Sequence, residues 1–94
     1  MEITLHSKEN EDALIGSVLI NPEVYQECAA ILDPADFYHA GNRAIWKAFS
    51  KLQSQKQDID QITVSDMVKA DGVQFSELVR MVSLSPNSYN AKFY

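Results

Sequence analysis

Cysteine and histidine are the residue types of this chain best suited to holding a transition metal, and they occur only at His6, Cys28 and His39. Zinc sites usually take ligands at close spacing along the chain, and these three residues lie far apart. Cys28 also falls on an apolar line of a predicted helix, where a cysteine packs as a small hydrophobic residue. The pattern therefore favours one core cysteine and two surface histidines over a metal site.

Paired carboxylates could act as a general acid and base, and Asp33 and Asp36 are the nearest candidates. Asp33 directly precedes Pro34, however, and this pair is typical of a helical turn that begins with a cap and a proline. Asp36 then adds negative charge near the positive end of that turn. A serine, histidine and aspartate could be combined into a triad only by invention, because no Gly-x-Ser-x-Gly elbow is present.

Nucleotide-binding loops need several glycines at fixed spacing, and this chain has only Gly16, Gly41 and Gly72. Neither a phosphate-binding loop nor a dinucleotide fingerprint can be built from them. We expect no cofactor in this chain and no hydrolysis of ATP by it.

The formal charge of −5 and the pI near 4.8 argue against a domain that grips a phosphate backbone, because the eight basic residues are scattered along the sequence. A helix-turn-helix pair could be formed by residues 63–70 and 75–84, but Glu77 and Arg80 are the only charges of its second helix. We expect no strong nucleic-acid binding and a basic or apolar protein partner. A lone cysteine and no long apolar run favour a cytoplasmic protein without a membrane segment.

The elements that position these residues are centred on the stretch from Leu32 to Leu52. It predicts a short turn at Asp33–Asp36, an aromatic anchor at Phe37 and Tyr38, and then an amphipathic helix with lysines on its outer side. We expect the core to contain these residues from this stretch and from the helix before it: Leu14, Val18, Phe37, Tyr38, Ile45, Trp46, Phe49 and Leu52.

Two helices are predicted before this centre. Ser7, Asn10 and Glu11 provide the capping chemistry at the start of the first helix. This helix is apolar nearly all round up to Ile20 and should be deeply buried. Gly16 inside it suggests that another helix crosses there at close range. Asn21-Pro22 begins the second helix, with one apolar line formed by Val24, Cys28 and Ile31.

Three further helices are predicted after it. Thr63 should cap a fourth helix, with Asp66 in the capping-box position and an apolar face of Val64, Met67 and Val68, and Asp71-Gly72 should stop it. Apolar spacing indicates a fifth helix that buries Phe75, Leu78, Val79 and Val82, and Ser85-Pro86 should begin a sixth. The prediction is one all-α domain over residues 1–94, a compact orthogonal array of about six short helices, with residues 1–8 as an N-terminal arm.

Several motifs in order resemble one family. They are His6-Ser7-x-Glu9-x-Glu11, Leu14-Ile15-Gly16-Ser17-Val18-Leu19-Ile20-Asn21-Pro22, Asp36-Phe37-Tyr38, Arg43-x-Ile45-Trp46, Ile59-Asp60-x-Ile62-Thr63-Val64, Leu84-x-Pro86-Asn87 and Tyr89-Asn90-Ala91. Together they resemble the amino-terminal domain of DnaB-type replicative helicases of bacteria and phages. The resemblance covers nearly the whole chain, and its specificity comes from the order and spacing of the motifs.

The resemblance implies a helical head without catalytic residues. Members of the family are ring-shaped hexamers whose ATPase motor, with its ATP and Mg, lies in a separate carboxy-terminal domain. In the family a helical hairpin follows the head, and head and hairpin form a collar that docks primase and in some systems a loader. Hairpin and motor are absent from these 94 residues, so we expect the isolated head to be a monomer or weak dimer.

Two departures from the family pattern affect what can be carried over. Relatives usually have histidine where this chain has Asn42, so the contacts of that histidine are not transferred. Between Gly72 and Ser85 the usual Val-Gly-Gly-x-x-Tyr-Leu segment is shortened. Partner contacts are assigned only to charged residues expected on the surface: Glu23, Glu27, Lys47, Lys51 and Glu77.

Two other classes of function stay open at this point. One is a free-standing adaptor or inhibitor with the same head fold that binds helicase or primase. The other is a small hydrolase or metalloprotein, which would show turnover or bound metal.

Overall fold

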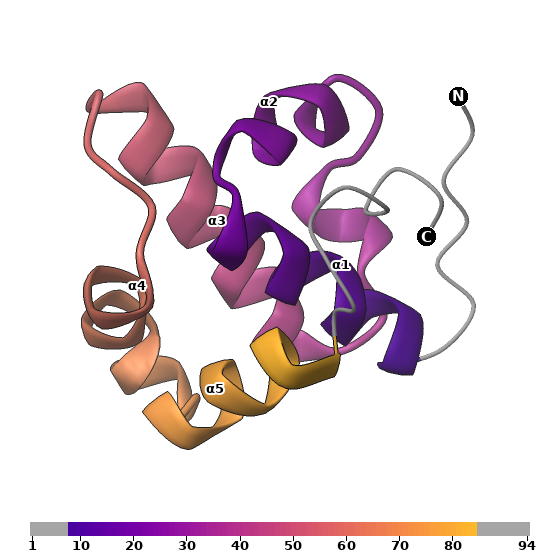
Figure 1. The fold of residues 1–94 in the computed structure, drawn as a ribbon, viewed down its shortest axis with the longest axis vertical. Helices are drawn as coiled ribbons and strands as arrows, with labels where there is room; N and C mark the ends of the chain where they lie inside the picture. Colours follow the sequence, from indigo (N-terminus) through magenta and orange to yellow (C-terminus); the bar gives the residue numbers. More distant parts are fainter. Residues whose placement is uncertain (1–7, 85–94) are drawn as a thin grey trace.

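The computed structural model describes residues 8–84, which form five α-helices and two short 3-10 turns without a strand (Figure 1). The helices are α1 (Lys8–Ile20), α2 (Glu23–Ala29), α3 (Ala40–Ser54), α4 (Gln61–Val68) and α5 (Phe75–Leu84), and the turns are η1 (Pro34–Asp36) and η2 (Lys69–Asp71). The predicted all-α class is confirmed. Within these residues no helix is long and apolar enough to cross a membrane.

The segments predicted at the two ends of the chain lie wholly or partly outside residues 8–84. The predicted sixth helix from Ser85 and residues 1–7 of the predicted arm fall outside the described residues. Lys8, the last residue of that arm, is instead the first residue of α1.

Helix α1 crosses α5 and also packs against α3, which in turn packs against α4 (Figure 1). At the crossing, a Cβ atom added to Gly16 would lie only 2.0 Å from the backbone oxygen of Met81. The two backbones touch here because glycine has no side chain. The close crossing predicted from Gly16 is confirmed.

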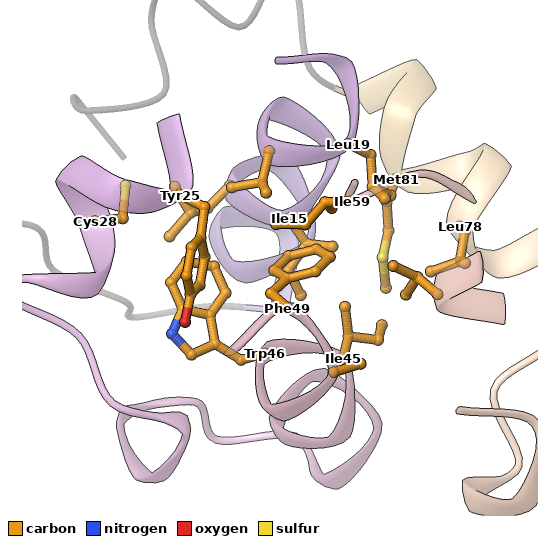
Figure 2. Close-up of a cluster of buried hydrophobic side chains, with 14 of the residues drawn as sticks. Ile15, Leu19, Tyr25, Cys28, Ile45, Trp46, Phe49, Ile59, Leu78 and Met81 are labelled. Atoms are coloured by element: carbon orange, nitrogen blue, oxygen red, sulfur yellow. The ribbon is translucent and has the colours of Figure 1, made fainter. Parts of the chain in front are cut away.

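The aromatic part of the core includes Trp46 of α3, which lies beside Tyr25 and Phe49 (Figure 2). The ring centroid of Trp46 lies 4.8 Å from that of Phe37, 5.1 Å from that of Tyr25 and 5.5 Å from that of Phe49. Such tilted and edge-on pairs add stabilisation beyond the burial of their area. The structure buries seven of the residues assigned to the core by sequence: Leu14, Val18, Phe37, Ile45, Trp46, Phe49 and Leu52.

The assignment of Tyr38 to the core is wrong, since its side chain is 81% exposed. Phe37 and His39 both have extended backbone, with ψ near 131° and 133°. Successive side chains of an extended segment point to opposite sides, so burying Phe37 turns Tyr38 outward.

The apolar faces of α2 and α5 differ from the prediction. Helix α2 ends at Ala29, so Ile31 is off its buried line and is exposed. Helix α5 buries Leu78 and Met81 and leaves Phe75 46% and Val79 43% exposed. The close contact between Met81 and Gly16 determines which face of α5 is turned toward the core. Residue spacing within α5 alone cannot predict this contact.

The start of α4 was also predicted wrongly. Asp60, and not Thr63, is the N-cap: its carboxylate accepts hydrogen bonds from the Thr63 amide at 2.8 Å and the Thr63 hydroxyl at 3.0 Å. The helix therefore begins at Gln61. Gly72 does close the following turn in the left-handed conformation, with φ of +83°, as predicted.

Candidate functional site: a buried polar network and a basic groove

Two consecutive acidic residues of α1, Glu11 and Asp12, are each only 1% exposed. Glu11 accepts hydrogen bonds from the backbone amide of Tyr38 at 2.8 Å and from the side-chain amide of Asn42 at 2.9 Å. Nδ1 of His39 lies 3.3 Å from the same carboxylate. Glu11 therefore sits at the amino-terminal end of α3, where the helix dipole favours a negative charge.

Asp12 connects α1 to both α3 and α5. Its Oδ1 accepts a hydrogen bond from Asn42 at 2.9 Å. Its Oδ2 accepts hydrogen bonds from Lys8 at 2.8 Å and from Arg80 at 2.5 Å. Burial alone would raise the pKa of Asp12, but the hydrogen bonds from Lys8, Arg80 and Asn42 outweigh it and hold the pKa below its usual value. Asp12 is therefore kept as a charged, fully partnered carboxylate.

Asn42 is the shared residue of this network. Its single Nδ2 donates both of its hydrogens, one to Glu11 and one to Asp12, each at 2.9 Å. A neutral imidazole has only one N–H, so a histidine at this position could not reproduce this pair of bonds from one atom. The side-chain amide of Asn42 is thus matched to the two buried carboxylates, Glu11 and Asp12.

Glu77 was assigned to partner binding, but its carboxylate is half-buried and already paired. It accepts hydrogen bonds from Nε and Nη2 of Arg80 and lies 3.2 Å from Nζ of Lys8. The bond from Arg80 is the main cause that lowers the pKa of Glu77. Both charges of the helix-turn-helix alternative, Glu77 and Arg80, are therefore engaged with each other and with α1.

The network is fully hydrogen-bonded and joins three helices. Every buried side-chain nitrogen and oxygen among residues 8–84 has a hydrogen-bond partner. A pocket of about 410 Å³ opens beside the network, and the polar groups on its wall include Lys8, Asn42 and Glu77, which the network already uses. These carboxylates hold α1, α3 and α5 together.

Of the residues considered for metal or acid–base chemistry, Cys28, Asp33 and Asp36 lie apart from this network. Cys28 is buried in the core, and Figure 2 shows it on the same side of the cluster as Tyr25. Within the described range, no group of three or more metal-ligating side chains comes together. Asp36 accepts a hydrogen bond from the backbone amide of Asp33 at 2.7 Å, as expected of a capped turn. His6 lies outside the described residues.

The other four assigned partner residues, Glu23, Glu27, Lys47 and Lys51, are exposed. Lys47 and Lys51 line a groove of about 450 Å³ between α3 and the α4–η2 segment, and α2, which carries Glu23 and Glu27, does not contribute to it. The groove is lined by Ala40, Arg43, Ala44, Lys47, Ala48, Lys51, Met67 and Asp71.

The sequence reading of the basic residues as scattered therefore missed this groove. Arg43, Lys47 and Lys51 stand at intervals of four residues, which places them on one side of a helix. That interval was the available signal. It is visible once α3 is recognised as a single helix through Ser54.

The sequence matches the family model described as "DnaB-like helicase N terminal domain" over residues 3–94. Curated relatives include the replicative DNA helicase DnaB of Rhodothermus marinus, 30% identical over 89% of this chain and 10% of the relative. The corresponding helicase of Geobacillus stearothermophilus is also 30% identical, over 94% of this chain and 20% of the relative. The chain thus spans about a fifth or less of the length of these relatives.

The fold has a close solved counterpart. The crystal structure of the N-terminal domain of DnaB helicase from Mycobacterium tuberculosis superposes with a TM-score of 0.87 at 21% identity, covering 98% of this chain and 67% of that one. At this identity the likeness shows the fold. Since the family model spans nearly the whole sequence, the chain belongs to the DnaB-like helicase N-terminal domain family.

Proposed function

We propose that this chain is the head of a replicative DNA helicase and acts through protein contacts. In this role it supports assembly of the hexamer collar and recruits primase or a loader in the cytoplasm during DNA replication. ATP and Mg would be bound by the motor domain of the helicase and not by the head.

The observation that carries this proposal is the family match over residues 3–94, supported by relatives whose names describe replicative DNA helicases. The chain corresponds to about a fifth or less of those relatives, so their helicase activity belongs to them as whole proteins. The contribution that we assign to this chain is a surface for protein contacts.

One feature of that surface suits protein contacts. The backbone around Tyr38 is held on both sides, because its amide donates to Glu11 at 2.8 Å and its carbonyl accepts from Arg43 at 3.0 Å. The ring is nevertheless 81% exposed. An exposed tyrosine on a fixed backbone loses little entropy on binding, and tyrosine is enriched among the residues that dominate protein interfaces.

Co-assembly tests the proposal. The chain would be mixed with the helicase and the primase encoded in the same genome, and complexes would be detected by size-exclusion chromatography with light scattering. We expect the chain to co-elute with at least one of them, and Tyr38→Ala to weaken that complex at least fivefold. Ile62→Ala, which removes an exposed apolar side chain on α4, is the matched control. Co-elution with neither protein would contradict the proposal.

A further inference from the structure

The groove beside α3 gathers positive charge on a chain whose formal charge is −5. Arg43, Lys47 and Lys51 follow one another at intervals of four residues along α3. A helix rises about 1.5 Å per residue, so their side chains leave α3 at intervals of about 6 Å. The groove thus presents a row of three evenly spaced cations.

These cations are available to a ligand. The ammonium groups of Lys47 and Lys51 are exposed and form no ion pair within residues 8–84, and the backbone carbonyl of Lys51 accepts hydrogen bonds from Ser54 and Gln55. Arg43 is held in place because its Nη1 donates to the carbonyls of Phe37 at 3.1 Å and Tyr38 at 3.0 Å. The rest of its guanidinium still carries donors, since the fork has five N–H groups. The row therefore combines one fixed and two adaptable cations.

The floor between the cations is small and apolar. Ala40, Ala44 and Ala48 alternate with the charged positions along α3, and Met67 of α4 lies on the opposite side of the groove. Alanine leaves room for another main chain to approach, and the methylene stems of the lysines add apolar contact area. A phosphate alone would make no use of this floor.

We propose that this groove binds an acidic helical segment of a partner protein whose carboxylates are spaced one turn apart. Glutamates at intervals of four residues repeat at about 6 Å, the same spacing as the cations on α3. Charge complementarity of this kind mainly sets partner choice and the rate of encounter. The inference rests on the proposed function, because it assigns one surface and one partner chemistry to the recruitment role.

The occupant is a protein segment and not a nucleic acid. Three cations neutralise few phosphates, and binding that depends on so few contacts is weak at physiological salt. Asp71 also lines the groove, and the chain as a whole is acidic, so a long polyanion would be repelled beyond the row.

The test is a titration of the isotopically labelled 94-residue chain, followed by NMR, with an alanine-based peptide of 20 residues that carries glutamates at every fourth position. We expect saturable shifts of the backbone amides along α3 and near Met67 and Asp71. A peptide with glutamine in place of each glutamate should shift them at least tenfold less. Shifts that map elsewhere, or equal shifts with both peptides, would overturn the proposal.

Charge reversal with a matched control separates the groove from the overall charge. The double variant Lys47→Glu/Lys51→Glu should bind the glutamate peptide at least tenfold more weakly than the unaltered chain. The double variant Lys56→Glu/Lys69→Glu changes the net charge equally at two exposed lysines that do not line the groove, and it should bind within twofold of the unaltered chain. Equal losses in both variants would show that only net charge matters and would refute the groove.

A third titration with a dodecamer of thymidylate decides between the two polyanions. If the DNA shifts the same amides at lower concentration than the peptide, the groove is a nucleic-acid site and the proposal is wrong. The peptide titration uses neither helicase nor primase, so it can fail while co-assembly succeeds. That pattern would reject the groove and leave the recruitment role standing.

Discussion

Arg80 on α5 donates a hydrogen bond to the buried carboxylate of Asp12 on α1, with 2.5 Å between Nη2 and Oδ2. The two residues are 68 positions apart, so this bond joins the beginning of the helical array to its end. The same guanidinium also pairs with Glu77, which helps to raise the pKa of Arg80.

Replacing Arg80 with methionine should destabilise the fold. The change keeps most of the apolar stem but leaves Asp12 with one charged partner fewer. Because Arg80 is partly exposed and water can replace some of its bonds, we expect a loss of about 1–3 kcal/mol in the free energy of unfolding. Urea titration measures it, with Lys47→Met as a control for loss of an exposed cation that forms no ion pair within residues 8–84. A change within 0.5 kcal/mol, a threshold typical of neutral surface substitutions, would show that the bond is dispensable.

Acidic pH should weaken the domain through Asp12. The pKa of Asp12 is lower in the folded chain than in the unfolded one, so the unfolded state takes up protons first as the pH falls. The stability contributed by Asp12 is fully present well above its unfolded pKa of about 4 and is lost as the pH drops through the folded value. Unfolding measured from pH 7 to pH 2.5 should therefore show a steeper loss below about pH 4 for the unaltered chain than for Asp12→Asn. Parallel curves would contradict this assignment.

Gly16→Ala should be destabilising although alanine favours helices. The added Cβ would meet the backbone oxygen of Met81 at 2.0 Å, and neither backbone can turn aside as a side chain would. We expect a loss of about 2–3 kcal/mol after the gain in helix propensity. Gly41→Ala is the control, because its Cβ would meet only a side-chain methyl of Val73 at 3.4 Å. Similar stabilities for the two variants would argue against the close crossing.

Trp46 and Tyr38 should respond in opposite ways to removal of their rings. Trp46→Ala removes the centre of the aromatic cluster and should cost about 3–5 kcal/mol. Tyr38→Ala should change stability by less than about 0.5 kcal/mol, because the ring is largely in water. Denaturant titrations of both variants make the comparison, and a loss under 1 kcal/mol for Trp46→Ala would remove Trp46 from the core.

The 94-residue chain by itself should sediment as a monomer or a weak dimer. The resemblance to DnaB-type helicases implies that a further helical hairpin takes part in the collar, and this chain covers 67% of the solved DnaB N-terminal domain from Mycobacterium tuberculosis. Sedimentation velocity from 1 to 100 μM, a range chosen to detect weak self-association, is the measurement. A stable hexamer at the lowest concentration would contradict the expectation.

Local patterns predicted the parts of the fold that local contacts determine. The spacing of Ile45, Phe49 and Leu52 predicted the buried face of α3, and Gly72 predicted the end of the turn after α4. Gly16 also predicted a close crossing, because a glycine inside a helix lowers helix stability and usually serves packing.

The errors arose where distant contacts decide. Phe37 and Tyr38 are equally suitable for a core, and only the extended backbone of the folded chain separates them. Glu11 was expected to cap its own helix, whereas its partners are Tyr38, His39 and Asn42, which lie 27 to 31 positions away. No spacing within α1 could reveal them. The basic groove was missed for a different reason, since its interval of four residues was present in the sequence but was counted as scatter.

The backbone contact at Gly16 has a mechanical consequence. Helix α5 cannot turn about its own axis without driving the Met81 carbonyl into α1, and it cannot slide along α1 without stretching the bond from Arg80 to Asp12. The two helices are therefore expected to move as one rigid unit. A force applied to α5 would therefore be transmitted to α1 at the beginning of the chain through this crossing.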